Sequence, residues 1–303
     1  MADDNTQKRI FRPSRGRLSR ADKYLADMME ADGKPIISDH DLFHFIRRMY
    51  AEAKDQKLYL RDSTATDDNY RTRKISLLAA NVIQHDRDYY NRFRVLALPD
   101  LPADDIVCLV DRFCYISHLS AMQRWGLTDR LPTTLMITRP DRWTISSKLK
   151  EIVRRNGETP FPMRSIGHPD TVRQRPVRVL ETRKAGAIIR DRSGFARVAT
   201  IGQTFLDTLQ QPALCGGMAH VLDVWHGNAG DYLEEIVETV DGSTSLIVKC
   251  RAGYILEEYL GFRDGRIDAW KTFRQRGGSR KLDPDRAFAP EYSEAWMISL
   301  NVR

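Results

Sequence analysis

The sequence predicts an α+β protein, in which an N-terminal region of alternating helices and short strands precedes a larger mixed α/β and helical region. Three observations predict this. Apolar residues recur at helical spacing directly after the capping residues Ser19 and Ser38. Short β-rich runs at 35–37 and 92–98 interrupt or follow the helices. The proline-marked stretch LPDLPADD at 98–105 divides the two regions, and 303 residues suffice for at least two cores.

Two helices open the first region. Ser19, with Asp22 three positions later, predicts a helix over 19–31 that stops before Gly33. Ser38 and Asp41 repeat the capping pattern and begin a second helix. The two apolar stripes are Leu25, Met28 and Met29, then Leu42, Phe45, Ile46 and Met49. Between the helices, the run at 35–37 predicts a strand.

A third helix and a hairpin follow. The segment NYRTRKISLLAANV predicts a helix over 68–80, with Ile75, Leu78 and Ala79 as its inward stripe. The β-rich runs VIQH and RFRVLAL flank the charged loop DRDYYN and predict a hairpin. The order of elements is therefore helix, strand, helix, helix, strand, strand.

This order is typical of a winged helix-turn-helix, in which the third helix enters the DNA major groove and the hairpin lies on the neighbouring backbone. The expected DNA-binding residues are Asn69, Tyr70, Arg71, Arg73, Lys74 and Ser76 on the helix, and Arg87, Asn91, Arg92 and Arg94 on the hairpin. The alternatives are a solvated helix face and a winged helix that docks proteins.

The chain begins with a basic arm, residues 1–18, before the DNA-binding domain expected over 19–99. Arg12, Arg15 and Arg17 belong to a stretch that has no acidic residue and contains Pro13 and Gly16. Such an arm can follow a phosphate backbone or enter a minor groove. A solvated tail is the equal alternative.

We expect residues 100–303 to form one domain. This domain either is undivided or consists of two subdomains, 100–165 and 166–303. Strands are expected at 106–110, at 133–138 and in three runs over 177–199, with helices at SHLSAMQRWG and near 146–155. Four helices follow, at 201–211, 217–226, 230–240 and 245–260. A second basic tract over 173–197 is either a solvated sheet face or another surface for polyanions.

Composition narrows the function. The formal charge is +7, with 48 Lys and Arg against 41 Asp and Glu, which favours polyanionic partners. Four scattered cysteines indicate neither a disulfide framework nor a zinc site. No apolar run is long enough to span a membrane and no secretory signal opens the chain, so we expect a cytoplasmic protein with no membrane partner.

We expect no enzymatic activity, cofactor or metal. Ser117 and His118 are adjacent on a helix and so are poorly placed as nucleophile and base. Glu181 and Lys184 lack the spacing of a nuclease core. The histidines form no H-E-x-x-H pair, and Gly216–Gly217 lacks the pattern of a phosphate loop.

Three blocks within 100–262 resemble the AbiEi family of antitoxins, which belong to type IV, abortive-infection toxin–antitoxin systems. The blocks are CLVDRFCYISHLSAMQRWGLTDRLP, VATIGQTFLDTLQQPALCGGMAHVLDVW and VKCRAGYILEEYLG. The resemblance implies a winged helix that represses its own operon at inverted repeats in double-stranded DNA. It also implies that the C-terminal domain counteracts a nucleotidyltransferase-like toxin, typically without a stable complex.

Two features depart from the family pattern, the long basic arm and a long segment between the second and third helices. Two other functions stay open. The C-terminal domain could be an enzyme that neutralises the toxin, or the chain could be a protein-interaction module without specific DNA binding.

Overall fold

The computed structural model describes residues 18–191, 194–274 and 280–302. The chain divides into two compact units, each a mixture of helices and strands, so the protein is of the α+β class. The first unit comprises Met1–Phe113 and Asp141–Arg175, and the second comprises Cys114–Pro140 and Pro176–Arg303.

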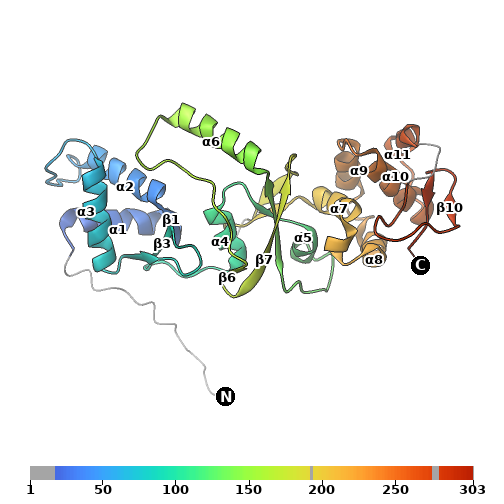
Figure 1. The fold of residues 1–303 in the computed structure, drawn as a ribbon, viewed down its shortest axis with the longest axis horizontal. Helices are drawn as coiled ribbons and strands as arrows, with labels where there is room; N and C mark the ends of the chain where they lie inside the picture. Colours follow the sequence, from blue (N-terminus) through green and yellow to red (C-terminus); the bar gives the residue numbers. More distant parts are fainter. Residues whose placement is uncertain (1–17, 192–193, 275–279, 303) are drawn as a thin grey trace, which may run out of the picture. The chain divides into compact units, whose positions relative to one another are not determined.

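The first unit begins with the predicted order of elements (Figure 1). These are α1 (Arg20–Asp32), β1 (Ile36–Ser38), α2 (Asp39–Glu52), α3 (Asp67–Ala79), β2 (Ile83–His85) and β3 (Arg92–Val95). The strands form an antiparallel sheet in the order β1-β3-β2, in which Phe93 pairs with both Ile37 and His85. The unit also contains α4 (Ala103–Val110), α6 (Arg142–Asn156) and β6 (Thr171–Val172).

Local capping and one shared core explain these elements. The side chains of Ser19, Ser38 and Thr66 each accept a backbone N–H in the first turn of α1, α2 and α3, which satisfies donors that a helix start leaves unpaired. The helices bury their apolar stripes against the sheet. The largest fully buried side chains here are Leu25, Met29, Ile37, Leu42, Ile46, Met49, Leu77 and Phe93. Each contributes roughly 1.5–3 kcal/mol by leaving water.

One predicted strand is a helix. Residues 106–110 lie in α4, which begins after Pro102 and carries Asp104 and Asp105 in its first turn. Its buried apolar residues Ala103, Ile106, Val107 and Val110 follow helical spacing, and acidic residues stabilise a helix N-terminus. The helical spacing of these residues becomes visible only when Ala103, directly after the proline, is included with 106–110.

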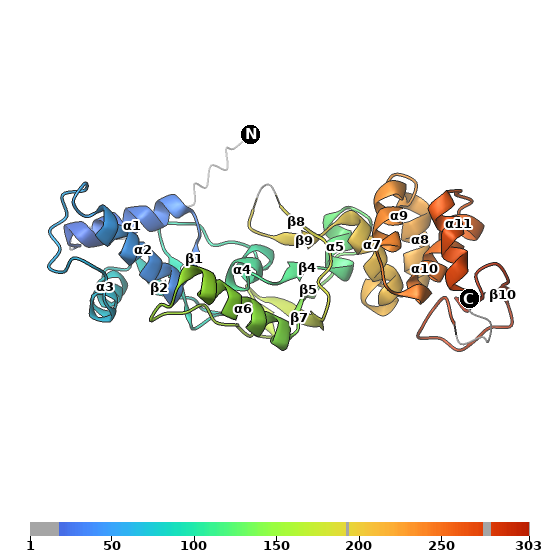
Figure 2. The ribbon, with the colours of Figure 1, turned by 90° about the horizontal axis from the view of Figure 1, so that it is seen from above.

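The second unit joins a small sheet to a helical layer (Figure 2). Five strands follow the order β7-β5-β4-β9-β8, with β5 parallel to β7, β4 parallel to β9 and the other pairs antiparallel. The strands are β4 (Tyr115–Ile116), β5 (Leu135–Pro140), β7 (Arg175–Thr182), β8 (Ile188–Arg190) and β9 (Arg197–Ala199). Helix α5 (His118–Arg124) connects β4 to β5.

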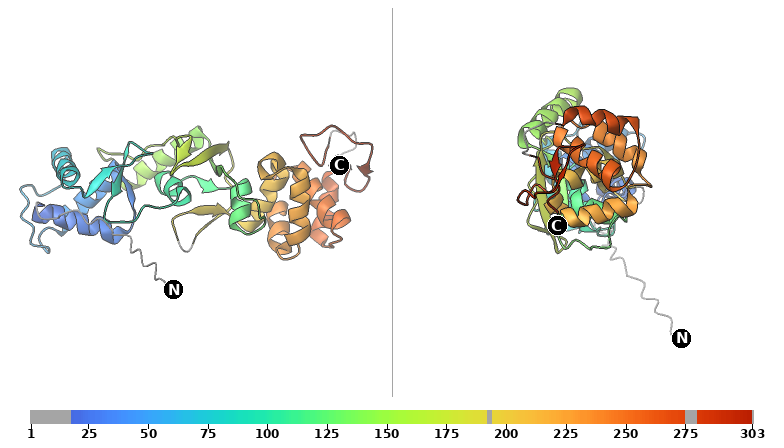
Figure 3. Two further views of the ribbon diagram at one scale, coloured as in Figure 1. Left: turned by 90° about the horizontal axis from the view of Figure 1, so that it is seen from below. Right: turned by 90° about the vertical axis from the view of Figure 1, so that its right-hand side faces the viewer.

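The helical layer contains the four helices that periodicity predicts (Figure 3). They are α7 (Ile201–Gln210), α8 (Met218–Asn228), α9 (Leu233–Asp241) and α10 (Leu246–Gly253), which continues as a π-helix over Tyr254–Tyr259; α11 (Gly265–Trp270) and the hairpin of β10 (Tyr292–Ser293) and β11 (Ile298–Ser299) follow. Phe205, Trp225, Trp270 and Trp296 fill the core.

This division differs from the predicted domain ranges of 19–99 and 100–303. Helix α4 and residues 141–175 cluster with the first unit. No helix within the described ranges is long and apolar enough to cross a membrane.

Candidate nucleic-acid interface

Helix α3 presents one face to solvent. Its exposed residues are Asp68, Arg71, Thr72, Ile75 and Ala79. Positions three, four and seven apart lie on the same side of a helix, so these residues form a single stripe. We call it the α3 outer face. In order along the helix, this face carries a carboxylate, a guanidinium, a hydroxyl and two apolar side chains.

This rotation of α3 differs from the predicted one. Ile75, expected inside, exposes 67% of its surface, whereas Tyr70 and Leu77 are buried. The weakly amphipathic sequence allows either rotation, because Ile75 and Leu78 could form an inward stripe as well as Leu77. The aromatic ring of Tyr70 decides, since it buries the larger area.

Tyr70 belongs to the interior of the first unit. Its ring packs against Phe43 and Phe161, with centroids 6.2 and 3.9 Å away, and its hydroxyl donates to the Asp39 carboxylate. Burial, together with that hydrogen bond, raises the pKa of Tyr70 above its ordinary value. The side chain predicted to contact DNA therefore anchors the helix instead.

Two other predicted readers bind α1. Arg73 donates to Asp22 over 3.1 Å, and the Ser76 hydroxyl donates to the other Asp22 oxygen over 2.9 Å. Asp22 is buried and also receives the Ser19 hydroxyl. A buried carboxylate requires such partners, so these residues hold the orientation of α3.

Lys74 and Asn69 are also engaged within the unit. Lys74 pairs with Asp39 at 3.0 Å and lies 4.5 Å from the centre of the Phe93 ring. Asn69 completes the capping box with Thr66 and donates to Asp62 over 2.9 Å. Among the helix residues expected to bind DNA, Arg71 is the one on the outer face; Thr72 and Ile75, which lie beside it, carry no charge that would mark them in the sequence.

Arg173 holds the loop between β2 and β3 through ion pairs with aspartates of that loop. The Asp86 side chain accepts the backbone N–H groups of Asp88 and Tyr89, and Arg173 bonds it at 2.6 Å. Arg173 also bonds Asp88 and, at 2.9 Å, Asp100. We call this set the Arg173 cluster.

The Arg173 cluster controls the ionisation of a buried carboxylate. Burial alone would raise the pKa of Asp86, but the hydrogen bonds and charge of Arg173, with the two backbone donors, lower it below its ordinary value. The Asp86 charge is therefore neutralised inside the unit. Asp86 therefore does not add a negative charge to the outer surface of the hairpin.

A second series of buried polar side chains holds the same loop. The Tyr89 hydroxyl lies 2.7 Å from His168 Nδ1, and His168 Nε2 lies 3.3 Å from an Asp111 oxygen. His168 and Arg173 come from the segment 141–175, and nothing in the local sequence marks either as a partner of the loop.

The hairpin surface is a mixture of exposed and engaged groups. Arg87, Tyr90 and Asn91 are exposed, and the Tyr90 ring stacks on His85 at 5.2 Å. Arg92 is half-buried and bonds the Asn91 carbonyl, and burial lowers its pKa.

Arg94 pairs with Asp100 at 3.6 Å, and its buried Nε has no hydrogen-bond partner among the described residues. Of the predicted hairpin residues, Asn91 and Arg87 are exposed, although Arg87 also pairs with Asp100 at 3.5 Å and with Asp88 at 3.9 Å. Arg12, Arg15 and Arg17 of the basic arm lie outside the described residues.

The second basic tract separates into two groups. Arg173 and Arg175 form ion pairs within the first unit, Arg175 with Asp104 at 2.6 Å. Among the described residues of the tract in the second unit, the exposed cations are Arg178, Arg183, Lys184 and Arg190.

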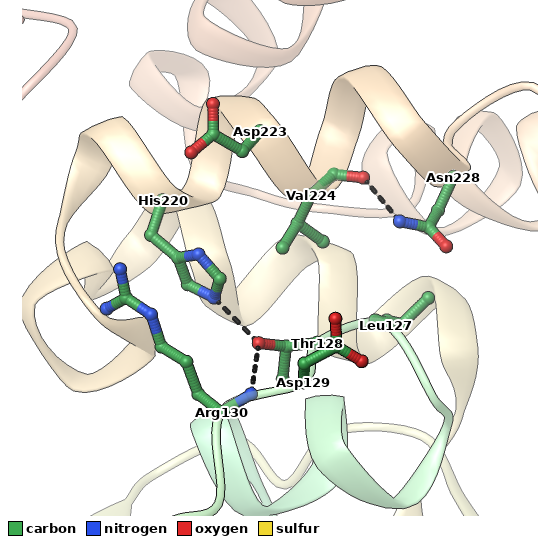
Figure 4. Close-up of a pocket in the computed structure, with 8 residues that line it drawn as sticks. All are labelled: Leu127, Thr128, Asp129, Arg130, His220, Asp223, Val224 and Asn228. Atoms are coloured by element: carbon green, nitrogen blue, oxygen red, sulfur yellow. Dashed lines mark hydrogen bonds between the residues drawn. The ribbon is translucent and has the colours of Figure 1, made fainter.

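The second unit contains a shallow pocket of about 350 Å³ between α8 and the loop 127–130 (Figure 4). Thr128 Oγ1 lies 3.0 Å from His220 Nε2, and Arg130 donates to the Gly216 carbonyl over 3.2 Å. Burial, followed by the Arg130 charge, lowers the pKa of His220. Asp129 and Asp223 also line the pocket, so its mixed charges favour no single class of ligand.

The side chains of Ser117 and His118 contact each other, although adjacent residues on a helix are predicted to face apart. The Ser117 hydroxyl lies 2.9 Å from His118 Nδ1 and 2.7 Å from the Thr138 hydroxyl. Contact between neighbours is possible because His118 has a φ of 51°. Ser117 occupies the start of α5, as expected, but its side chain does not cap the helix.

This polar cluster is buried. Burial lowers the pKa of His118 to about 4, so the ring is neutral at pH 7. Nearby, burial raises the pKa of Asp207 to about 7, against the hydrogen bonds from Gln203 and the His118 backbone. The second Asp207 oxygen is buried without a hydrogen-bond partner among the described residues, so the cluster satisfies its members only in part.

Comparison with known proteins gives little. No family model matches the chain, and no curated protein matches it. It is similar to the crystal structure of the RV2827C protein from Mycobacterium tuberculosis, with 13% sequence identity and a TM-score of 0.48, over 93% of this chain and 92% of that one. A likeness of this strength carries no argument about function.

Proposed function

We propose that the first unit is a winged helix-turn-helix that binds double-stranded DNA. The observation that carries the proposal is the α3 outer face. Within a three-helix, three-stranded arrangement, α3 keeps one side exposed to solvent and places Arg71 and Thr72 on it. A helix inserted into the major groove requires such a side, with donors for base edges.

The hairpin of β2 and β3 is the wing in this proposal. Arg87, Asn91 and Tyr90 supply a cation, an amide and an aromatic ring at its surface. Phosphate contacts position a protein on the duplex, and base contacts specify the sequence. The helix therefore reads bases, while the wing and the basic arm contact the backbone.

In the cell, this DNA binding represses the protein's own operon at inverted repeats, and the second unit counteracts a nucleotidyltransferase-like toxin. This part of the proposal depends on the resemblance of 100–262 to AbiEi antitoxins. Repression requires only occupancy of the promoter, so it needs no catalytic group.

The test is a gel-shift titration against the DNA upstream of the gene, with random duplex of equal length as competitor. We expect preferential binding by the wild type. Arg71→Ala should weaken it by a factor of roughly 5 to 160, because a bidentate arginine–guanine contact contributes about 1–3 kcal/mol. Its side chain pairs only distantly with Asp67, at 3.8 Å, so the fold should be unaffected.

Lys23→Ala is the matched control, because Lys23 is an exposed cation on α1. It should bind like the wild type. Equal affinity of the Arg71 variant and the control would reject α3 as the reading helix. Binding that ignores sequence would reject the repressor, and a stable toxin complex without DNA affinity would support a protein-interaction module.

A further inference from the structure

Ile75 is an unusual residue on the α3 outer face. Among the described residues of the first unit with large exposed hydrophobic side chains, which are Tyr59, Ile75, Tyr90 and Trp143, it is the only aliphatic one. It has no hydroxyl or ring nitrogen with which to bind water. Under the proposed function, DNA bound to α3 would cover this side chain.

The rotation of α3 is fixed, so Ile75 cannot turn inward. Tyr70 and Leu77 occupy the core on the opposite side, and Arg73 and Ser76 bind the buried Asp22 on α1. Turning the helix enough to bury Ile75 would expose Leu77 and leave Asp22 without its partners. Whatever binds this face meets Ile75 directly.

The major groove offers one apolar group on its base edges, the 5-methyl group of thymine. We propose that Ile75 packs against the 5-methyl group of a thymine in each half-site and so helps to specify the operator. This inference depends on the proposed function, because it requires α3 to lie in the groove.

The spacing between Arg71 and Ile75 on the α3 outer face also predicts how far apart the two contacted bases lie along the DNA. Arg71 and Ile75 are four residues apart, which is about 6 Å along the helix axis. Successive bases lie about 3.4 Å apart along a strand. The thymine therefore lies about two base steps from the guanine that Arg71 contacts, with Thr72 between them.

The experiment begins with duplexes selected from a random library by the full-length protein. Each thymine of the selected site is then replaced in turn by deoxyuridine, which removes only the methyl group. We expect one position in each half-site at which this weakens wild-type binding about fourfold, the factor for about 0.8 kcal/mol per methyl-sized group buried. Ile75→Ala should bind the thymine and deoxyuridine duplexes equally, and Ile75→Val should keep the discrimination.

The outcomes separate this inference from the proposed function. If the protein selects a site but no deoxyuridine position matters, or if Ile75→Ala retains the discrimination, the methyl contact is wrong and DNA binding stands. If no duplex is selected, both fail. Melting curves of the Ile75 variants show whether the fold is intact, and the exposed side chain predicts that it is.

Discussion

The clearest ionisation effect in this protein belongs to a single residue, Asp207. One of its oxygens accepts from Gln203, and the other is buried without a hydrogen-bond partner among the described residues. Burial raises its pKa to about 7, from the 3.8 expected in an unfolded chain. The folded protein therefore keeps a proton that the unfolded chain releases between these values.

This proton difference sets the direction of a pH effect. Between about pH 4 and pH 7 the folded state binds more protons at Asp207, so its contribution to stability falls as the pH rises, by at most about 1.4 kcal/mol per unit. Between pH 5 and pH 7, the melting temperature of Asp207→Asn should therefore fall less, or rise more, than that of the wild type. The exposed Asp231→Asn is the control, and an unchanged pH dependence in Asp207→Asn would contradict the assignment.

At the scale of elements, the hairpin of β2 and β3 depends on a distant residue. Arg173→Ala would leave Asp86 buried without its cation, and breaking a buried ion pair in this way costs about 3–5 kcal/mol. We expect a large loss of stability in urea and faster hydrogen exchange at the loop of the hairpin. Arg178→Ala, which removes an exposed arginine from the next strand, should have little effect.

A double variant tests the mechanism. Asp86→Asn keeps an acceptor for the backbone N–H groups of Asp88 and Tyr89 but removes the buried charge. Combined with Arg173→Ala, it should recover part of the lost stability. If the two losses simply add, the charge of Asp86 is not what Arg173 neutralises.

Elements were predictable where their signals are local. The bounds of α1 and α3 agree with the prediction within about one residue, because capping serines and threonines and the helical period lie within a few positions of one another. The rotation of α3 was not predictable, since it depends on Phe161 and Asp22, which are distant in sequence. Of the six α3 side chains expected to bind DNA, five are therefore engaged within the unit.

At the scale of the whole molecule, the first unit is not one continuous stretch of chain. A fragment of residues 19–99, the DNA-binding domain that the sequence predicts, lacks Phe161, His168 and Arg173. We expect this fragment to melt at a lower temperature than the full chain and to exchange the α3 amide protons faster. Equal protection of α3 in both would show that the segment 141–175 adds no stability.

The discontinuity of the first unit also has a consequence for synthesis. The chain passes between the units after Phe113, Pro140 and Arg175. A ribosome adds about 5–20 residues per second, so roughly 9–35 s pass before Arg173 has been added and the hairpin can be completed. Under the proposed function, the order of the chain therefore sets a minimum delay between the start of translation and the first molecule able to bind DNA.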